Sequence, residues 1–461
     1  MQPAIGMNAR LRSRSPVEVR THHAPRILLL TASLGAGHAR AAHAIAAALR
    51  TRHPGCAIRT QDFWTLMDEA VAASLQRAYL NVVRGRPGLY DRIYRLDQRT
   101  WRAILAGAPL PAPLLQGLDI LAGTARRTLD EFGPRARHPF DRVMLRCFCG
   151  ALDSATRLLP GASNLLRLAI IRSGWTILAR RLDAVLRTFA PDVMVSTQMN
   201  PAALLVLCAQ RRRAGIPSIG VITDFGVHDF WLQRGVDRYC LPHEDVQLPA
   251  RRADAPATVT GMPLMPQFQR LPEQAVARAQ LALPQDEPVI LVAGGGLGLG
   301  VERVVRALLG SSGRLHVLAV LGRNPSAASQ LRQCPHPRVR LWEWTEDMAL
   351  LMRAADIVVG KPGGLTVAEA LACGRPLLAT DTLRAQEDFN LRFMQRHDVG
   401  ALVAEQDLVP RIDALLESRA ALRAMQARAG AIGRRDGAAH IAALALSLIE
   451  SVPAHAPAKA H

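Results

Sequence analysis

One glycine-containing loop carries a histidine that could move a proton. Gly35-Ala36-Gly37-His38 follows the apolar run Arg26–Ala32 and precedes an alanine-rich stretch. Glycines allow a ligand to approach the backbone closely, and the first N–H groups of a following helix attract anions. Histidine titrates near neutral pH, so His38 is a candidate general base. A plain tight turn is the alternative interpretation, because the full GxGxxG fingerprint is absent.

A second loop, Thr223–Trp231 (TDFGVHDFW), gathers polar and aromatic residues directly after another apolar run. It holds two carboxylates, one histidine and three aromatic residues in a chain that is only 4% aromatic. Asp224 and His228 are catalytic candidates, and Trp231 is a candidate for contact with an acceptor. The alternative is an ordered loop with a capping aspartate and buried rings.

The C-terminal half has two more glycine loops that each follow an apolar run. The first is Gly294-Gly295-Gly296, which suits either the approach of a diphosphate or acceptor, or a tight turn. The second is Gly363-Gly364, which we expect to open a helix. Such a junction is the physical arrangement that holds a phosphate group, because the helix N-terminus carries free backbone N–H groups.

Charged residues flank the second of these loops. Lys361 is one of only two lysines in a chain that otherwise uses arginine, the other being Lys459. A compact ammonium group at that place suits a diphosphate. Glu369, which we expect in the first helical turn, either favours the helix dipole or binds ribose hydroxyls.

Composition sets limits on the partners. The formal net charge of +19 favours anionic partners. A bias of the genome toward arginine codons is an alternative explanation for the preference for arginine over lysine, but it does not explain the excess of positive over negative charge. No motif typical of nucleic-acid binding accompanies the charge, so we expect no nucleic-acid partner. Cys147 and Cys149 form a lone CxC pair, too little for a zinc site. We expect no metal and no cofactor, and reduced cysteines typical of the cytoplasm.

The apolar runs must position these loops. Short apolar runs alternate with helical segments, which predicts parallel sheets covered on both faces. The predicted fold class is α/β, with two Rossmann-like domains facing each other across a cleft. We expect disordered tails at 1–25 and 451–461, an N-terminal acceptor-binding domain at 26–260, a linker at 261–270 and a C-terminal sugar-nucleotide domain at 271–450.

The segment 63–174 departs from this alternation. It is rich in leucine and arginine and is interrupted by prolines. We expect a helical insertion that lies on an anionic membrane surface, or else an ordinary helical subdomain whose arginines face water. The first 25 residues carry no apolar segment typical of a secretory signal, so we expect none, and the sequence has no stretch of 18 uncharged apolar residues. The predicted location is therefore the cytoplasm, with peripheral binding to the inner face of the cell membrane.

Six stretches occur in the order typical of one known family. The resemblance is to the monogalactosyldiacylglycerol synthase and diacylglycerol glucosyltransferase family, which is related to the peptidoglycan UDP-N-acetylglucosamine transferase. The matching stretches are GAGHARAAHAI (35–45), FAPDVMVST (189–197), GVITDFGVHDFWLQRGVDRYCLPHEDV (220–246), VTGMPLMPQF (259–268), LMRAADIVVGKPGGLTVAEALACGRPLL (351–378) and AQEDFN (385–390). One departure is Gln198, where the family often has histidine.

The resemblance implies a GT-B fold, an inverting mechanism, a UDP-sugar donor and a lipid acceptor. It also implies the roles of single residues. His38 matches the histidine of the family's glycine loop, with Asp224 and His228 next in rank. The implied donor contacts are Trp344 and Thr345 for uracil, Gly363, Gly364 and Thr366 for the diphosphate, Glu369 for the ribose, and Gln386, Glu387 and Asn390 for the sugar.

Three other functions stay open from the sequence. One is transfer of N-acetylglucosamine to another lipid-linked acceptor. A second is a UDP-sugar epimerase of the same fold, which would need no acceptor. The third is a non-catalytic basic module, which would leave the glycine loops unexplained.

Overall fold

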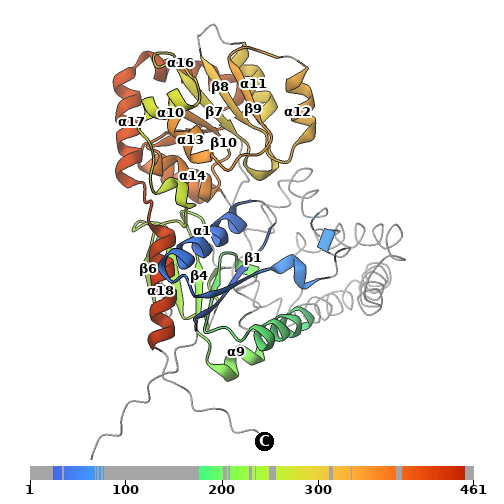
Figure 1. Cartoon of the computed structure of the whole chain (residues 1–461). Helices are drawn as coiled ribbons and strands as arrows, with labels where there is room; N and C mark the ends of the chain where they lie inside the picture. The colour runs from blue at the N-terminus through green and yellow to red at the C-terminus, as the bar shows by residue number, and fades with distance from the viewer. Residues whose placement is uncertain are drawn as a thin grey trace, which may run out of the picture.

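The computed structural model shows two α/β lobes, one above the other in Figure 1. The structure describes residues 24–33, 36–67, 69, 72–73, 76, 176–200, 205, 208–227, 231–233, 235–248, 256–298, 300–310, 315–333, 335–380 and 387–451. The predicted tails and most of the predicted 63–174 insertion lie outside these residues. Within the described residues, no helix is both long and apolar enough to span a bilayer.

The N-terminal lobe is built on a six-stranded parallel sheet with the order β2-β1-β3-β4-β5-β6. Most of its strands are buried on both faces, which is why they read as continuous apolar runs. The strands are β1 (Arg26–Thr31), β2 (Ala57–Asp62), β3 (Val193–Ser196), β4 (Ser218–Val221), β5 (Arg238–Leu241) and β6 (Ala257–Val259).

The C-terminal lobe has its own six-stranded parallel sheet, with the order β12-β11-β10-β7-β8-β9. This is the doubly wound order, in which the strand sequence reverses between β7 and β10 and leaves a crevice at their carboxyl ends. The strands are β7 (Val289–Ala293), β8 (His316–Val320), β9 (Val339–Trp342), β10 (Ile357–Gly360), β11 (Leu377–Ala379) and β12 (Gly400–Leu402).

Helices cover both faces of each sheet. In the N-terminal lobe these are α1 (Gly37–Arg52), a helix over 176–189 and α9 (Ala209–Ala214). In the C-terminal lobe they are α10 (Gln274–Gln280), α11 (Val301–Leu309), α12 (Pro325–Arg332), α13 (Met348–Ala354), α14 (Gly364–Ala372), α15 (Asp388–Arg396), α16 (Leu408–Glu417) and α17 (Arg419–Ile432). The predicted α/β class with two Rossmann-like domains is confirmed.

The last helix, α18 (Gly437–Ser451), belongs to the N-terminal lobe. Figure 1 shows it running down beside that lobe's sheet, next to α1. Its residues Ile441, Ala442 and Ala445 are fully buried among β1, β3 and α1. The sequence prediction that the C-terminal domain extends to 450 is therefore wrong for this helix. Its small side chains allow it to pack closely on the sheet face that it shares with α1.

The chain thus crosses between the lobes twice, and the two crossings touch. Gly261 has φ +88, and a Cβ added there would lie 3.4 Å from the Cα of Gly437. A Cβ on Gly437 would lie only 2.3 Å from the carbonyl oxygen of Met262. His440 also hydrogen-bonds the carbonyl of Thr260 at 2.9 Å. The two connections therefore form one packed junction.

The carboxyl edges of the two sheets face each other. A Cβ on Gly296, after β7, would lie 2.8 Å from the Cβ of Ala36, which precedes α1. A Cβ on Gly364, at the start of α14, would lie 1.9 Å from the carbonyl oxygen of Thr223, after β4. The loops singled out in the sequence therefore meet between the lobes.

Candidate functional site

His38 stands at the start of α1, at the switch point of the N-terminal sheet. Its Nδ1 lies 2.8 Å from the carbonyl oxygen of Thr197, which follows β3, and 3.2 Å from Oγ1 of Thr223, which follows β4. A hydrogen on Nδ1 that is donated to the Thr197 carbonyl leaves Nε2 as a hydrogen-bond acceptor. Burial lowers the pKa of His38 to about 4, and the ring is therefore neutral at pH 7.

Asp224 is the second titratable group of the site, and its side chain is held from the opposite lobe. Its Oδ1 accepts a hydrogen bond of 2.9 Å from the amide of Asn390 in α15. The amide oxygen of Asn390 in turn accepts the N–H of Phe225 at 2.7 Å. Asn390 is fully buried, so both of its polar ends are satisfied inside the interface.

The carboxyl group of Asp224 has an unusual pKa. The pKa is raised to about 7, chiefly by burial and to a smaller extent by the nearby Glu387 carboxylate. The amide of Asn390, the backbone N–H of Gly364 and the ammonium group of Lys361 oppose this rise. A carboxyl group with a pKa near neutrality can accept or donate a proton at physiological pH.

Both base candidates sit in neighbouring loops, but they are held separately. Among the described residues the His38 ring is hydrogen-bonded to Thr197 and Thr223, and no hydrogen bond joins it to Asp224. In this arrangement Asp224 therefore cannot take a proton directly from His38, because no hydrogen bond joins the two side chains.

The helix α14 supplies the opposite wall. Its N-cap Gly363 has no side chain that could cap the helix, so the first N–H groups of α14 are left for partners from elsewhere in the fold. The N–H of Gly364 donates to the Asp224 carboxyl group. Only glycine fits at position 364, because a Cβ would meet the Thr223 carbonyl oxygen at 1.9 Å.

Lys361 lies just before this helix and is largely buried. Its Nζ is 3.0 Å from Oε1 of Glu387, which immediately precedes α15. Glu387 is only 5% exposed. A buried carboxylate of this kind requires a partner, and Lys361 supplies one. The ammonium group, the helix N-terminus and two carboxyl groups thus share one small volume.

Glu369 is paired across the lobes, a contact that the sequence analysis missed. Its Oε1 lies 3.2 Å from Nη2 of Arg40, in the first turn of α1. Burial raises the pKa of the Glu369 carboxyl group, and the charge of Arg40 lowers it. Glu369 is the sixth residue of α14, so the prediction of a place in the first turn is wrong. The contact could have been anticipated from the sequence Gly37-His38-Ala39-Arg40, which places Arg40 in the first turn of α1, close to the C-terminal lobe.

The glycine loop after β7 is packed tightly. Gly295 and Gly298 have φ of +65 and +59, which favours glycine. A Cβ on Gly322, after β8, would lie 2.7 Å from the carbonyl oxygen of Gly295. The loop that contains Gly294 to Gly296 therefore lies between the loop after β8 and the N-terminal lobe.

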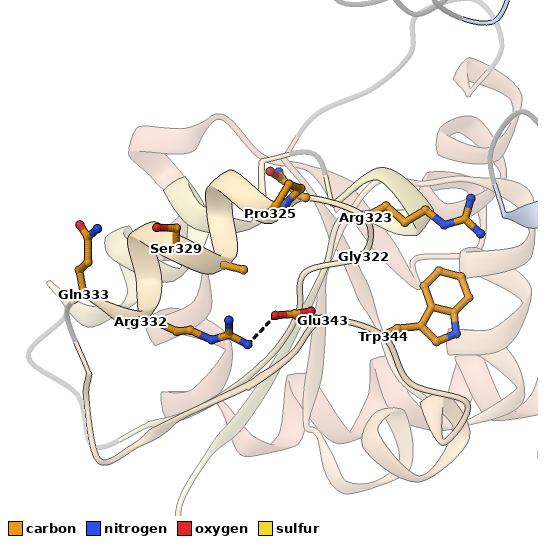
Figure 2. A pocket seen from close by; sticks show the side chains of 10 residues that line it. Gly322, Arg323, Pro325, Ser329, Arg332, Gln333, Glu343 and Trp344 are labelled. Atoms are coloured by element: carbon orange, nitrogen blue, oxygen red, sulfur yellow. Dashed lines mark hydrogen bonds and ion pairs between the residues drawn. The ribbon is translucent and has the colours of Figure 1, made fainter. Parts of the chain in front are cut away.

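Trp344 and Thr345 lie further along the same edge, after β9. Trp344 is 48% exposed, and the guanidinium carbon of Arg323 lies 5.6 Å from the centroid of its ring. Figure 2 shows these two side chains at one end of a hollow of about 790 Å³ and the Arg332–Glu343 ion pair toward the other. An exposed ring beside a cation offers a flat stacking surface.

Several predicted residues are placed differently or not at all. Trp231 is only 3% exposed and lies in the core, where its carbonyl accepts a hydrogen bond from the Tyr239 hydroxyl at 3.1 Å. That burial does not fit the predicted contact with an acceptor, because the ring is packed among other core side chains. Gly37 lies in the first turn of α1, where a Cβ would meet no atom within 4 Å. Gly35, His228 and Gln386 lie outside the described residues.

Comparisons with known proteins agree with this architecture. Residues 160–264 match the family model "Monogalactosyldiacylglycerol (MGDG) synthase", and residues 295–418 match "Glycosyl transferases group 1". MurG of Acinetobacter baumannii has a similar structure, with a TM-score of 0.53 and 14% identity over 92% of this chain and all of that one. The fold and these matches define a glycosyltransferase of the GT-B class.

Relatives with a similar sequence indicate which kind of glycosyltransferase this chain resembles. A processive diacylglycerol beta-glucosyltransferase of Bacillus cytotoxicus is 26% identical over 288 residues, which span 61% of this chain and 74% of the relative. The protein of the same description from Bacillus pumilus is 27% identical over 260 residues, 54% of this chain and 66% of the relative. The chain is thus similar to the monogalactosyldiacylglycerol synthase and diacylglycerol glucosyltransferase family, and the resemblance that its motifs predicted is confirmed.

Proposed function

We propose that this glycosyltransferase moves a hexose from a UDP-sugar to a diacylglycerol-type lipid acceptor, with inversion at the anomeric carbon. The reaction would produce a glycolipid. The family relationship supports the acceptor class, because the two named Bacillus relatives are described as diacylglycerol glucosyltransferases. The geometry between the lobes supports the donor class.

The observation that carries the proposal is the junction at the start of α14. A helix N-terminus without a side-chain cap lies beside the ammonium group of Lys361, at the switch point of a doubly wound sheet. This arrangement suits an anion of high charge density, such as a diphosphate. The Asp224 carboxyl group now accepts the N–H of Gly364, so a carboxylate already stands where a diphosphate oxygen would bind.

The nucleoside would extend from this junction along the edge of the same sheet. Trp344 and Thr345 would meet the base, and the exposed Trp344 ring beside Arg323 offers a surface for stacking. Glu369 would accept the ribose hydroxyls once Arg40 moves aside, because the two side chains now pair. Glu387 and Asn390 would lie near the sugar.

The chemical step then has defined groups. The acceptor hydroxyl oxygen bonds to the anomeric carbon, the bond from that carbon to the diphosphate oxygen breaks, and its electron pair leaves with UDP. The α14 N-terminus and Lys361 stabilise the charge that grows on the leaving diphosphate. The hydroxyl proton passes to Nε2 of His38 or to the carboxylate of Asp224.

The two candidate bases differ in strength. His38 is already deprotonated at pH 7, but a pKa of about 4 makes it a weak base until a neighbouring anion raises that pKa. Asp224 has a pKa of about 7, close to the value that favours proton transfer at neutral pH. Donor binding would displace Asp224 from the Gly364 N–H and free its carboxylate for this role.

We also propose that the enzyme works at an anionic membrane surface, on the cytoplasmic side. The net charge of +19 supports this placement, since each basic residue near such a surface contributes at most about 1 kcal/mol. Sedimentation with liposomes, with and without anionic lipid, tests it. Equal sedimentation with both lipid mixtures would contradict it.

The proposed reaction is tested by incubating purified protein with labelled UDP-sugars and mixed lipids, and by identifying the product by mass spectrometry. We expect a hexosyl diacylglycerol and free UDP. Release of an epimerised nucleotide sugar without a glycolipid would indicate an epimerase, and an N-acetylglucosaminyl lipid would indicate the other transferase. Absence of binding heat with every uridine diphosphate compound would overturn the donor assignment.

A further inference from the structure

Three side chains with metal-binding atoms meet where the loop after β5 contacts the end of α15. His243 and Asp245 lie in the loop after β5, and His397 directly follows α15. The Nε2 of His397 is 2.7 Å from Oδ2 of Asp245, and Nδ1 of His243 is 3.9 Å from the same oxygen. One ligand atom from each of the three residues lies within 4.8 Å of the other two.

The two imidazole rings are oriented by packing. The ring of Phe393 lies 5.0 Å from the His243 ring and 4.4 Å from the His397 ring, and it also stacks on Phe225 at 4.2 Å. The His243 side chain is 12% exposed and that of His397 is 22% exposed, whereas Asp245 keeps 35%. Phe393 thus holds both rings in place, while the Asp245 side chain remains exposed to solvent.

We propose that His243, Asp245 and His397 bind a divalent transition-metal ion of the Zn²⁺ type. Zinc binds imidazole nitrogen and carboxylate oxygen at about 2.0–2.2 Å in a tetrahedral arrangement, which sets the ligand atoms about 3.3 Å apart. The separations of 2.7 and 3.9 Å fall on either side of that value, and the Nδ1 of His243 would exchange the N–H of Asp245, which it now accepts at 3.2 Å, for the ion. Two imidazoles select a transition metal over Mg²⁺ or Ca²⁺, and water completes the fourth position.

Carboxylates offset the arginine charges near the cluster. Arg434 is ion-paired with Glu244, and Arg428 is ion-paired with Asp398. Each of these arginine charges is therefore offset by a carboxylate. The Nε2 of His397 would bind the ion through its lone pair, in the tautomer that carries the hydrogen on Nδ1.

Such an ion would join the two lobes. His243 and Asp245 belong to the N-terminal lobe, and His397 belongs to the C-terminal lobe. The helix that ends at His397 carries Asn390 near its other end, where it hydrogen-bonds Asp224. The ion would therefore fix α15 against the N-terminal lobe along its length. This site does not depend on the proposed reaction.

The experiment is a competition titration of tag-free, chelator-treated protein with Zn²⁺ against a chromophoric chelator. We expect one equivalent of tightly bound Zn²⁺, with affinity lowered by about tenfold or more in His397→Gln, His243→Gln and Asp245→Asn. His336→Gln is the matched control. His336 is exposed, and its Nδ1 accepts the N–H of the second following residue at 3.2 Å, as the Nδ1 of His243 does.

Thermal unfolding provides a second readout that needs no enzyme activity. Zn²⁺ should raise the melting temperature of the wild type and of His336→Gln, and leave that of His397→Gln unchanged. Mg²⁺ should raise none of them. Absence of a tight equivalent in the wild type, or equal Zn²⁺ affinity in all four variants, would show that His397 and Asp245 form a hydrogen-bonded pair only.

Discussion

The amide of Asn390 joins the two lobes by donating to Asp224 and accepting from the backbone N–H of Phe225. The two bonds measure 2.9 and 2.7 Å, and the amide is fully buried. Because one bond needs a donor and the other an acceptor, no carboxylate or apolar side chain of similar size could make both. Asn390 therefore sets the position of Asp224 and also its proton affinity.

We expect Asn390→Leu to shift the pH dependence of the reaction. The amide N–H stabilises the ionised Asp224, so its loss raises the pKa of that carboxyl group above its value of about 7. If Asp224 accepts the proton, the acid limb of kcat/KM moves to higher pH by about one unit. The matched control is Gln426→Leu, which removes a half-buried amide that donates to the carbonyl of Asp356 at 3.1 Å. A profile identical to that of the wild type would exclude Asp224 as the titrating group.

The role of His38 is tested against another histidine of the same helix. His38→Ala should lower kcat by about 10²- to 10⁴-fold, because the Nε2 acceptor is lost. His43→Ala is the control, since His43 is exposed on α1 and should leave kcat unchanged. Steady-state rates with the labelled donor measure both. Full activity in His38→Ala would assign proton removal to Asp224.

The closeness of the lobes predicts that position 364 tolerates only glycine. In Gly364→Ala the new Cβ would overlap the carbonyl oxygen of Thr223, so the lobes must separate. We expect a large loss of kcat/KM and a more extended particle in small-angle X-ray scattering. Gly430→Ala, inside α17, is the control, because its Cβ would have no atom closer than 3.8 Å.

That control should stabilise the fold by about 0.4–1 kcal/mol. Its scattering profile should match that of the wild type. A compact, fully active Gly364→Ala protein would mean that the reacting arrangement is more open than the one described here.

Lys361 should matter more for turnover than for binding. Lys361→Ala removes a charge that acts most strongly when the diphosphate leaves, so kcat should fall by about 10²-fold or more. The affinity for UDP, measured by calorimetry, should fall less. The substitution also removes the ion-pair partner of the buried Glu387, so Lys361→Ala combined with Glu387→Gln separates the two effects. An unchanged kcat in the double variant would contradict the role of the ammonium group.

The sequence predicted the strands well because they are buried and parallel. Runs such as Val289–Ala293 are apolar at every position, and such runs cannot face water on either side. Not every strand has this character: β2, β6 and β9 contain no buried residue, and β12 contains one. The order of strands and the facing of the two lobes follow from the family resemblance rather than from any local pattern.

Contacts between distant segments could not be predicted. Asn390 and Asp224 are 166 residues apart, and His397 and Asp245 are 152 residues apart. Residue types alone do not state which loops the fold brings together. Trp231 shows the opposite error: its occurrence in a polar loop suggested a ligand contact, but a large ring also buries much apolar surface when it packs in a core. Likewise, the small residues of α18 indicate close packing without saying on which sheet.

The packed junction of Gly261 with Gly437 has a consequence for how the molecule opens. Two connections that touch at one place leave the halves free to tilt about that place, but they resist sliding and twisting, which would pull the connections apart. The lobes can therefore separate mainly by tilting about this junction. For the same reason neither half can be isolated by a single cut: a chain ended before 437 would leave the apolar surface beneath Ile441 bare to water, and the first half would aggregate.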